Sequence, residues 1–302
     1  MGRKFIAYLK ELRSPFFIAV IIPVILGTIM AWKKTGAIHW GYFWLALIGA
    51  AFLNGGINTA NDYFDHKSGN DEANKEYVGP FTGGSRLIQE GLLSPREVFF
   101  ESMVCFAAAV LIGLYLTYQR GFPILWVGLI GAISGFFYTA PPFYWAKRGV
   151  GELLVGLNCG ILICLGAYYV QAQSIDLLPV IPAIPIGLLI TAVLYINEFP
   201  DYEADKSVGK NNIVVRLGRE RAVKGYNLLI ISVYVAIIAG VALRMIPVIA
   251  LFSFLTLPLA IKSIGVLKKY YAEPAKLLPA NMATINLHLI IGIILNVSYF
   301  LA

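Results

Sequence analysis

The sequence contains few charged residues. Lys, Arg, Asp and Glu make up 14% of its 302 residues, whereas 58% are hydrophobic, and the mean hydropathy is +0.73. A soluble domain of this size does not need so much apolar material, so the surface of the folded chain must itself be apolar. The shortage of charge therefore argues against a soluble protein and indicates a membrane protein.

Cysteine and histidine are also scarce. Cys105, Cys159 and Cys164 lie within apolar stretches, and their number and spacing fit neither a disulfide framework nor a metal site. The three histidines are scattered, which argues against a zinc site. The basic N-terminus leads into a full-length apolar stretch without a cleavage motif, so we expect no cleaved signal.

Nine apolar stretches are long enough to cross a membrane as helices. They cover residues 15–32, 41–60, 98–118, 122–140, 152–172, 177–198, 222–242, 245–263 and 281–301. If the N-terminus is cytoplasmic, only four of the 24 Lys and Arg residues fall outside, namely Lys33, Lys34, Arg120 and Arg244.

This distribution obeys the positive-inside rule. We therefore predict an all-helical protein that forms one domain over residues 1–302 and is integral to the cell (inner) membrane. Its N-terminus is cytoplasmic and its C-terminus lies outside. The net charge of +7 then reflects topology, and we expect no nucleic-acid partner.

Two long cytoplasmic loops, about residues 61–97 and 200–222, begin with similar acidic segments. DYFDHKSGND covers residues 62–71, and DYEADKSVGKN covers residues 201–211. In the first segment, Asn61 and Asp65 are four residues apart, so both lie on one helix face. Asn54, Asn58 and Asp62 follow the same spacing.

The second segment repeats this pattern, because Asn197, Asp201 and Asp205 also lie four residues apart. Carboxylates crowded in this way repel one another unless a cation lies between them. Hard oxygen ligands without Cys or His suit Mg²⁺. The candidate metal ligands are Asn58, Asp62, Asp65, Asp201 and Asp205.

Basic residues lie on the same side of the membrane as these acids. A site that combines Mg²⁺ ligands with Lys and Arg suits a phosphate or a diphosphate. The candidate diphosphate contacts are Asn61, Lys67, Arg86, Lys147, Arg148 and Asn197. A substrate with an anionic head and a hydrocarbon tail would match both the polar face and the apolar bundle, and prenyl diphosphates have this shape.

Three segments resemble motifs of the UbiA family of intramembrane prenyltransferases. NDYFDHKSGND (61–71) resembles its first Asp-rich motif, and NEFPDYEADKSVGKNNIVVRLG (197–218) is similar to its second. YTAPPFYWAKRGVGE (138–152) looks like the loop that follows its fourth helix. The order and spacing also agree over essentially the whole chain.

The resemblance implies a bundle of nine transmembrane helices around a central cavity, with loop caps on the cytoplasmic side. It implies Mg²⁺-dependent transfer of a polyprenyl group from a prenyl diphosphate to an aromatic acceptor. Asn61 and Asp65 match the first motif, and Asp201 and Asp205 the second. Lys67, Tyr138 and Lys147 match positions that hold the diphosphate or line its pocket.

The chain departs from the family at Gly69, where many members carry a further Asp. Asp62 or Asp71 is a candidate replacement. GPFTGGSRLIQEGLLSP (79–95) looks most like the menaquinone branch, which prenylates 1,4-dihydroxy-2-naphthoate. The alternatives are the same chemistry on 4-hydroxybenzoate or on geranylgeranylglyceryl phosphate.

The mechanism we expect begins with loss of diphosphate, which leaves an allylic cation that the ring of Tyr138 can stabilise. We expect Asp65, Asp201, Asp205 and Tyr138 to be catalytic. The general base, the prenyl chain length and the oligomeric state stay open, and no obligatory protein partner is visible. A cation transporter is the rival class, but transporters place ionisable groups near the membrane midplane, whereas these acids cluster at one face.

Overall fold

The computed structural model describes residues 2–79 and 82–302, and this part of the chain contains helices and no strands. The α-helices are α1 (Gly2–Glu11), α2 (Ile18–Thr35), α3 (Trp40–Ser68), α4 (Asn70–Ala73), α5 (Pro95–Arg120), α6 (Pro123–Phe136), α7 (Gly151–Gly156), α8 (Ile163–Ala172), α9 (Val180–Asn197), α10 (Tyr202–Ser207), α11 (Ile213–Leu217), α12 (Arg219–Ala242), α13 (Leu257–Tyr270) and α14 (Leu278–Leu301). Shorter 3₁₀ or π segments are η1 (Ser14–Phe17), η2 (Trp145–Arg148), η3 (Leu157–Leu162), η4 (Val248–Thr256) and η5 (Pro274–Lys276).

Each predicted membrane span coincides with a helical segment. Within the described residues, eight segments are long and apolar enough to cross a membrane: Lys4–Thr35, Trp40–Ser68, Pro95–Arg120, Gly151–Ala172, Val180–Asn197, Arg219–Ala242, Val248–Tyr270 and Leu278–Leu301. The ninth, predicted at 122–140, is shorter in the structure: α6 has 14 residues and ends at Phe136. Such a helix is about 21 Å long, shorter than the hydrocarbon core of a membrane, which is about 30 Å thick. The helix is short because the chain turns after Phe136 toward the loop that carries Tyr138.

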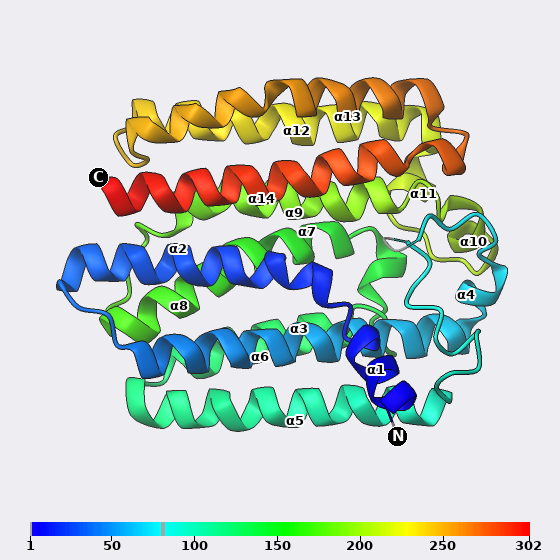
Figure 1. Ribbon diagram of the computed structural model, residues 1–302, viewed down its shortest axis with the longest axis horizontal. Coiled ribbons are helices and arrows are strands. Elements are labelled where there is room, and N and C mark those ends of the chain that lie inside the picture. The colour runs from blue at the N-terminus through cyan, green and yellow to red at the C-terminus, as the bar shows by residue number, and fades with distance from the viewer. Residues whose placement is uncertain (1, 80–81) are drawn as a thin grey trace.

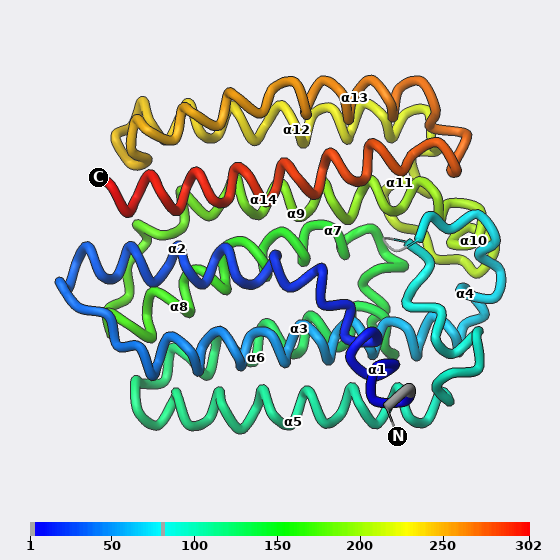
Figure 2. The backbone as a smooth tube through the Cα atoms, viewed as in Figure 1, coloured from blue at the N-terminus to red at the C-terminus, as the bar shows by residue number. Residues whose placement is uncertain are grey.

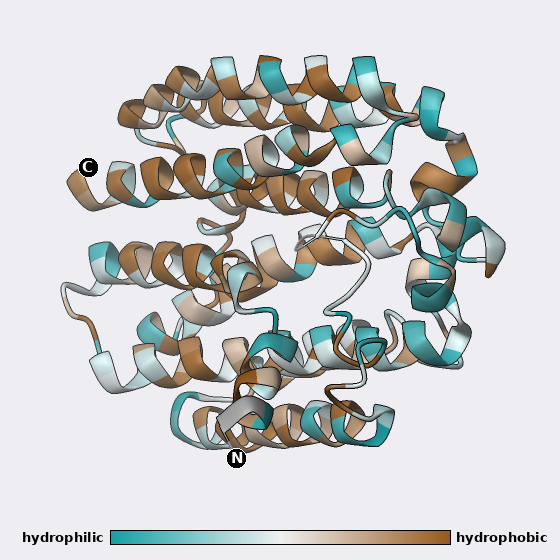
Figure 3. Ribbon diagram, turned by 45° about the vertical axis from the view of Figure 1, so that its right-hand side comes forward, coloured by the Kyte–Doolittle hydropathy of each residue, from teal (hydrophilic) through white to brown (hydrophobic). Residues whose placement is uncertain are grey.

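The long helices run side by side, and the polar connections gather at one end of the bundle (Figure 1). We call this the loop end; it holds α4, α10 and α11, whereas the C-terminus lies at the opposite end (Figures 1 and 2). Hydropathy follows the same division, with hydrophilic residues concentrated at the loop end (Figure 3). The two acidic segments therefore meet in space, although they are far apart in sequence.

The outward faces of the bundle are apolar. Phe100 on α5, Leu228 on α12 and Ile261 on α13 are exposed, as are many other large hydrophobic side chains. Water would penalise such a surface, whereas lipid would not. Together with the long apolar helices, this surface identifies an integral membrane protein.

The helices that surround the centre of the bundle pack closely through small residues. A Cβ added at Gly160 would lie 2.5 Å from the Cα of Gly187 on α9, and one at Gly156 would meet the Gly187 carbonyl oxygen at 3.0 Å. Helices approach this closely in membranes only where small residues face each other. The π-helical turn η3 lies between α7 and α8 and carries Asn158 toward the centre of the bundle.

Candidate active site

A polar cavity of about 220 Å³ lies inside the loop end of the bundle. Its walls come from the N-terminal region and from α3, α6, α7, α9 and α10, together with the loops of both acidic segments. The charged residues that line it are Arg13, Asp65, Asp71, Glu198, Asp201, Asp205 and Lys210. Negative charge predominates, so the cavity suits a ligand that brings cations with it.

The first acidic segment lies on the last turns of α3. Asn61 and Asp65 share one helix face, as predicted, and the Asn61 amide donates to Asp65 Oδ2 at 3.2 Å. Gly69 ends the helix with φ +78°, a left-handed conformation that glycine adopts without strain. This turn leads into α4, which brings Asp71 into the cavity lining.

The second segment does not form the continuous helix that its spacing suggested. The structure ends α9 at Asn197 and begins α10 at Tyr202. Pro200 lacks an amide hydrogen and disfavours helical geometry in the residue before it, so the helix cannot continue through this point. Asp201 and Asp205 still form one turn, since the Asp205 amide donates to the Asp201 carbonyl at 2.8 Å, and both line the cavity with Asn197.

Amide side chains hold the carboxylates of the second segment. Asn70 Nδ2 donates to Asp205 Oδ1 at 2.9 Å, and Asn74 Nδ2 donates to Asp201 Oδ1 at 2.6 Å. Asn212 Nδ2 donates to Asp205 Oδ2 at 2.7 Å. Burial nevertheless raises the pKa of Asp205 to about 7, with Lys210 acting in the opposite direction. The first segment thus closes over the second through direct hydrogen bonds.

Lys210 is the central cation of the site, a role that we did not predict from its position in the sequence. Its Nζ lies 3.0 Å from Asp65 Oδ2 and 3.5 Å from Asp205 Oδ1. α10 ends at Ser207, and Gly209, with φ +70°, then turns the chain so that the Lys210 amide donates to the Asp205 carbonyl. One feature of the sequence could have indicated this role: Lys210 directly follows Gly209 at the end of the second acidic segment.

Three further predicted residues line the cavity. Tyr138 follows α6, and burial raises its pKa well above the ordinary value. Asn58 donates to the Leu12 carbonyl at 3.3 Å and to Asn54 Oδ1 at 3.2 Å. Asn197 accepts a hydrogen bond of 2.7 Å from Asn281 on α14.

Five predicted residues do not belong to the lining of this cavity, as far as the described residues show: Asp62, Lys67, Arg86, Lys147 and Arg148. Asp62 faces the loop that follows α4, where its Oδ2 accepts from the Ser85 amide at 2.8 Å. Arg86 donates to the Asp71 carbonyl at 2.5 Å, so it holds the backbone of a residue that lines the cavity. The ammonium of Lys67 lies over the ring of Tyr63, and Arg148 is exposed. Lys147 lines a small separate pocket, which Lys210 also lines.

The donors in the polar cavity fit Mg²⁺ by their chemistry. No three Asp, Glu, His or Cys side chains within residues 2–79 and 82–302 are close enough to hold a metal ion by themselves. However, Mg²⁺ is commonly bound through one or two carboxylates, with waters and substrate phosphates as its other ligands. The buried Oδ1 atoms of Asn70 and Asn74 accept no hydrogen bond from the described residues, so unused oxygen donors surround the carboxylates.

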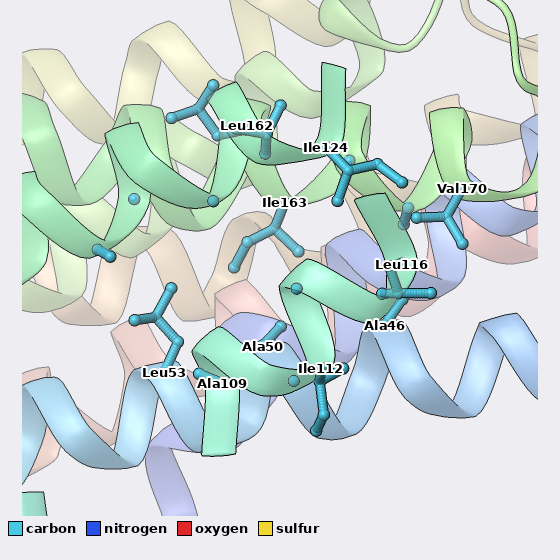
Figure 4. A pocket seen from close by; sticks show the side chains of 18 of the residues that line it. Ala46, Ala50, Leu53, Ala109, Ile112, Leu116, Ile124, Leu162, Ile163 and Val170 are labelled. Atoms are coloured by element: carbon cyan, nitrogen blue, oxygen red, sulfur yellow. The ribbon is translucent and has the colours of Figure 1, made fainter. Parts of the chain in front are cut away.

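An apolar cavity of about 280 Å³ adjoins the polar one. It lies among α3, α5, α6 and α8, and Leu53, Ile112, Ile163 and Val170 are among the side chains around it (Figure 4). Asn54, Ile57, Asn158 and Cys159 line both cavities. A molecule with a polar head and an apolar tail can therefore lie across the two.

Comparisons with known proteins agree with this geometry. The model of the UbiA prenyltransferase family matches residues 20–287. The chain is 28% identical to a 2-carboxy-1,4-naphthoquinone phytyltransferase of Synechocystis sp., over 97% of this chain and 92% of that protein. It is 32% identical to a 1,4-dihydroxy-2-naphthoate octaprenyltransferase of Escherichia coli, over 72% of this chain and 70% of that protein.

A solved structure has the same fold. It is that of a UbiA homolog from Archaeoglobus fulgidus bound to GPP and Mg²⁺, and it superposes with a TM-score of 0.62 at 17% identity. The match covers 98% of each chain. At this identity, the similarity concerns the arrangement of the helices.

Proposed function

This chain belongs to the UbiA prenyltransferase family, and from that membership we propose the reaction that it catalyses. It transfers a polyprenyl group from a prenyl diphosphate to 1,4-dihydroxy-2-naphthoate, a step of menaquinone biosynthesis, and it requires Mg²⁺. The observation that carries this proposal is the junction of an acidic polar cavity with an apolar cavity inside one helical bundle. The names of the two relatives support the naphthoate acceptor.

The diphosphate head binds in the polar cavity. Asp65, Asp201 and Asp205 are the carboxylates that would contribute to a Mg²⁺ site, with diphosphate oxygens and water as further ligands, and the ion would neutralise the diphosphate as a leaving group. Lys210 lies within 3.5 Å of two of these carboxylates, so its ammonium can donate to a diphosphate oxygen. Asn61 on α3 and Asn197 on α9 also line this cavity and orient the head.

The basic residues outside the cavity have supporting roles. Arg86 holds the backbone of Asp71 in place, and Lys147 lies beside the small pocket behind Lys210. Lys67 and Arg148 are exposed at the loop end, where their charge attracts an anionic head toward the cavity. Because the loop end carries most of the basic residues, we place it on the cytoplasmic side.

The prenyl tail lies in the apolar cavity, where burial of its methylene groups contributes binding free energy of about 25 cal/mol per Å². The reacting carbon then lies near the residues shared by the two cavities, in the cavity that Tyr138 also lines. Departure of the diphosphate leaves an allylic cation, and the face of the Tyr138 ring stabilises it by about 1–2 kcal/mol. The contacts of Asn70 and Asn74 with the second segment close the loops and exclude water from the cation.

The test uses purified protein in lipid nanodiscs with Mg²⁺, geranylgeranyl diphosphate and a panel of acceptors. The panel contains 1,4-dihydroxy-2-naphthoate, 4-hydroxybenzoate and geranylgeranylglyceryl phosphate, and products are identified by mass. We expect a prenylated naphthalene product, and we expect Asp65→Asn or Asp201→Asn to abolish it while Glu203→Gln, at an exposed position, retains it. Prenyl transfer to none of the three acceptors would refute the proposal.

A further inference from the structure

α1 differs from the long helices in its direction and in the use of its two faces. It crosses the long helices near the loop end instead of running beside them (Figures 1 and 2). Its inner face consists of Ala7, Tyr8 and Glu11, and its outer face consists of Phe5, Ile6 and Leu9. The three outer side chains are 64%, 53% and 50% exposed, whereas Ala7 and Glu11 are buried. An apolar face kept outside the protein is typical of a helix that lies in the surface layer of a membrane.

Contacts with α5 fix the depth of α1. Lys4 forms an ion pair with Glu97, and the Tyr8 hydroxyl donates to Glu97 Oε1 at 3.4 Å. Glu97 lies in the first turn of α5, a helix of 26 residues that is about 39 Å long. The hydrocarbon core of a membrane is about 30 Å thick, so α5 extends beyond it, with the charges of Arg96 and Arg120 at its two ends. α1 therefore lies level with the lipid headgroups at the loop end.

We propose that the outer face of α1 binds anionic phospholipid in this layer of the membrane. Phe5, Ile6 and Leu9 enter between the acyl chains, just below the headgroups. Lys10 borders the outer face, because it lies four residues after Ile6. It is exposed, and its side chain makes no hydrogen bond or ion pair with the described part of the chain. Its ammonium is therefore available to the phosphate of an anionic headgroup, which carries no cation of its own to oppose it.

A second cation lies at the same depth. Arg96, in the first turn of α5, is exposed and has no ion-pair partner among residues 2–79 and 82–302. Lys10 and Arg96 thus face the headgroup layer without compensating carboxylates. A second copy of this chain would bring the same positive charges to the outer face of α1 and would be repelled, whereas anionic lipid is attracted.

The inner face of α1 connects the membrane surface to the polar cavity. Glu11 Oε2 accepts from Ser85 Oγ at 2.5 Å, and Ala7 packs with Leu87 in one apolar cluster. Both partners belong to residues 82–94, the segment that leads into α5. The same segment lines the polar cavity through Thr82, Gly83 and Gly84. Lipid binding by α1 thus stabilises one wall of the cavity. If the proposed prenyl transfer holds, it lowers the KM for the prenyl diphosphate.

The first experiment measures lipid binding without any reaction. A fluorescent thiol-reactive dye is attached to Leu9→Cys or, as the matched control, to Glu90→Cys, an exposed position in the segment before α5. The wild type treated with the same dye gives the background from the native cysteines. Each protein is placed as a single copy in nanodiscs of phosphatidylcholine alone or with increasing phosphatidylglycerol.

A lipid that carries a nitroxide near its headgroup should quench the dye at position 9, and more strongly as the phosphatidylglycerol content rises. Acrylamide in the water should quench the dye at position 90 more strongly than the dye at position 9. Adding Lys10→Glu to Leu9→Cys should remove the dependence on phosphatidylglycerol, because the charge at the edge of the outer face then repels the anionic headgroups.

The second experiment measures the link to the polar cavity. Phosphatidylglycerol should lower the KM of the wild type for geranylgeranyl diphosphate about fivefold, the factor that one basic residue near an anionic surface contributes to binding. Lys10→Glu should lose this dependence on lipid. Lys268→Glu, with the same change of charge at an exposed position in the last turn of α13, should keep it.

The possible failures are separable. Equal quenching of both dyes by acrylamide, or lipid quenching that does not depend on phosphatidylglycerol, would overturn the binding of anionic lipid by α1. A wild-type KM that is the same in both lipids would overturn the link to the cavity. The quenching measurements need no substrate, so absence of prenyl transfer refutes the proposed function and leaves the lipid site standing.

Discussion

Replacement of Lys210 by Met tests the electrostatic arrangement of the site. The side chain of Lys210 is 13% exposed, and its ammonium lies 3.0 Å from one carboxylate and 3.5 Å from another. Met keeps most of the volume but removes the charge. Removing one partner of a buried ion pair leaves an uncompensated charge and costs about 3–5 kcal/mol.

Divalent ions should distinguish this effect from a simple packing defect. In EDTA at neutral pH, we expect Lys210→Met to unfold at least ~6 °C below the wild type, given about 2 °C or more per kcal/mol. Mg²⁺ should recover more stability in Lys210→Met than in the wild type, because the unpaired carboxylates gain more from a cation. The deficit should shrink as pH falls: Lys210 opposes the burial that raises the pKa of Asp205 to about 7 in the wild type, so this pKa lies higher in Lys210→Met, and protonation of Asp205 then removes the uncompensated charge.

The assay is thermal unfolding in nanodiscs, with and without Mg²⁺, followed by a thiol-reactive dye or by intrinsic fluorescence. Lys206→Met is the matched control, because Lys206 lies four residues earlier, on α10, is exposed, and its side chain touches only the ring of Tyr202 among the contacts described. If Lys210→Met were as stable as Lys206→Met in EDTA, or if Mg²⁺ stabilised both variants equally, the reasoning would be wrong.

Three further outcomes follow from the structure. Gly128 lines the apolar cavity, and an added Cβ would meet no described atom within 4 Å. Gly128→Leu should therefore raise the KM for geranylgeranyl diphosphate about tenfold and leave the KM for geranyl diphosphate unchanged. Gly265→Leu, at a similarly open position away from the cavity, should change neither KM. Burial and nearby carboxylates raise the pKa of Asp71 to about 9, so the wild type loses stability as pH rises from about 4 toward 9. The unfolding temperature of Asp71→Asn should therefore exceed that of the wild type by an amount that grows over this pH range. A difference in unfolding temperature that does not depend on pH would contradict this. Asn70→Ala removes a donor from Asp205 at a cost of about 1–3 kcal/mol, and limited proteolysis of residues 70–94 should become faster than in Ser94→Ala, whose side chain caps only α5.

Local patterns in the sequence were sufficient for the membrane spans and for the polarity of the two ends. Apolar stretches of about 20 residues have few alternatives to a membrane helix, and the structure places a helical segment at each of them. Asn61 and Asp65 also came together as expected, since a spacing of four residues within one helix fixes their common face. The helix predicted to carry Asn197, Asp201 and Asp205 on one face is not continuous, because Pro200 interrupts it.

The sequence by itself thus determined the membrane-spanning helices, the acidic loop end and most of the carboxylates of the cavity, because hydrophobicity and helical spacing act over a few neighbouring residues. Only the tertiary structure decided that Lys210 lies between Asp65 and Asp205, and that Asp62 faces Ser85 instead of the cavity. It also decided that Glu198 lines the cavity, with its carboxyl beside that of Glu152. Those positions depend on how the helices rotate against one another and on contacts between residues that lie from 23 positions apart, for Asp62 and Ser85, to 145 positions apart, for Asp65 and Lys210, which no local pattern contains.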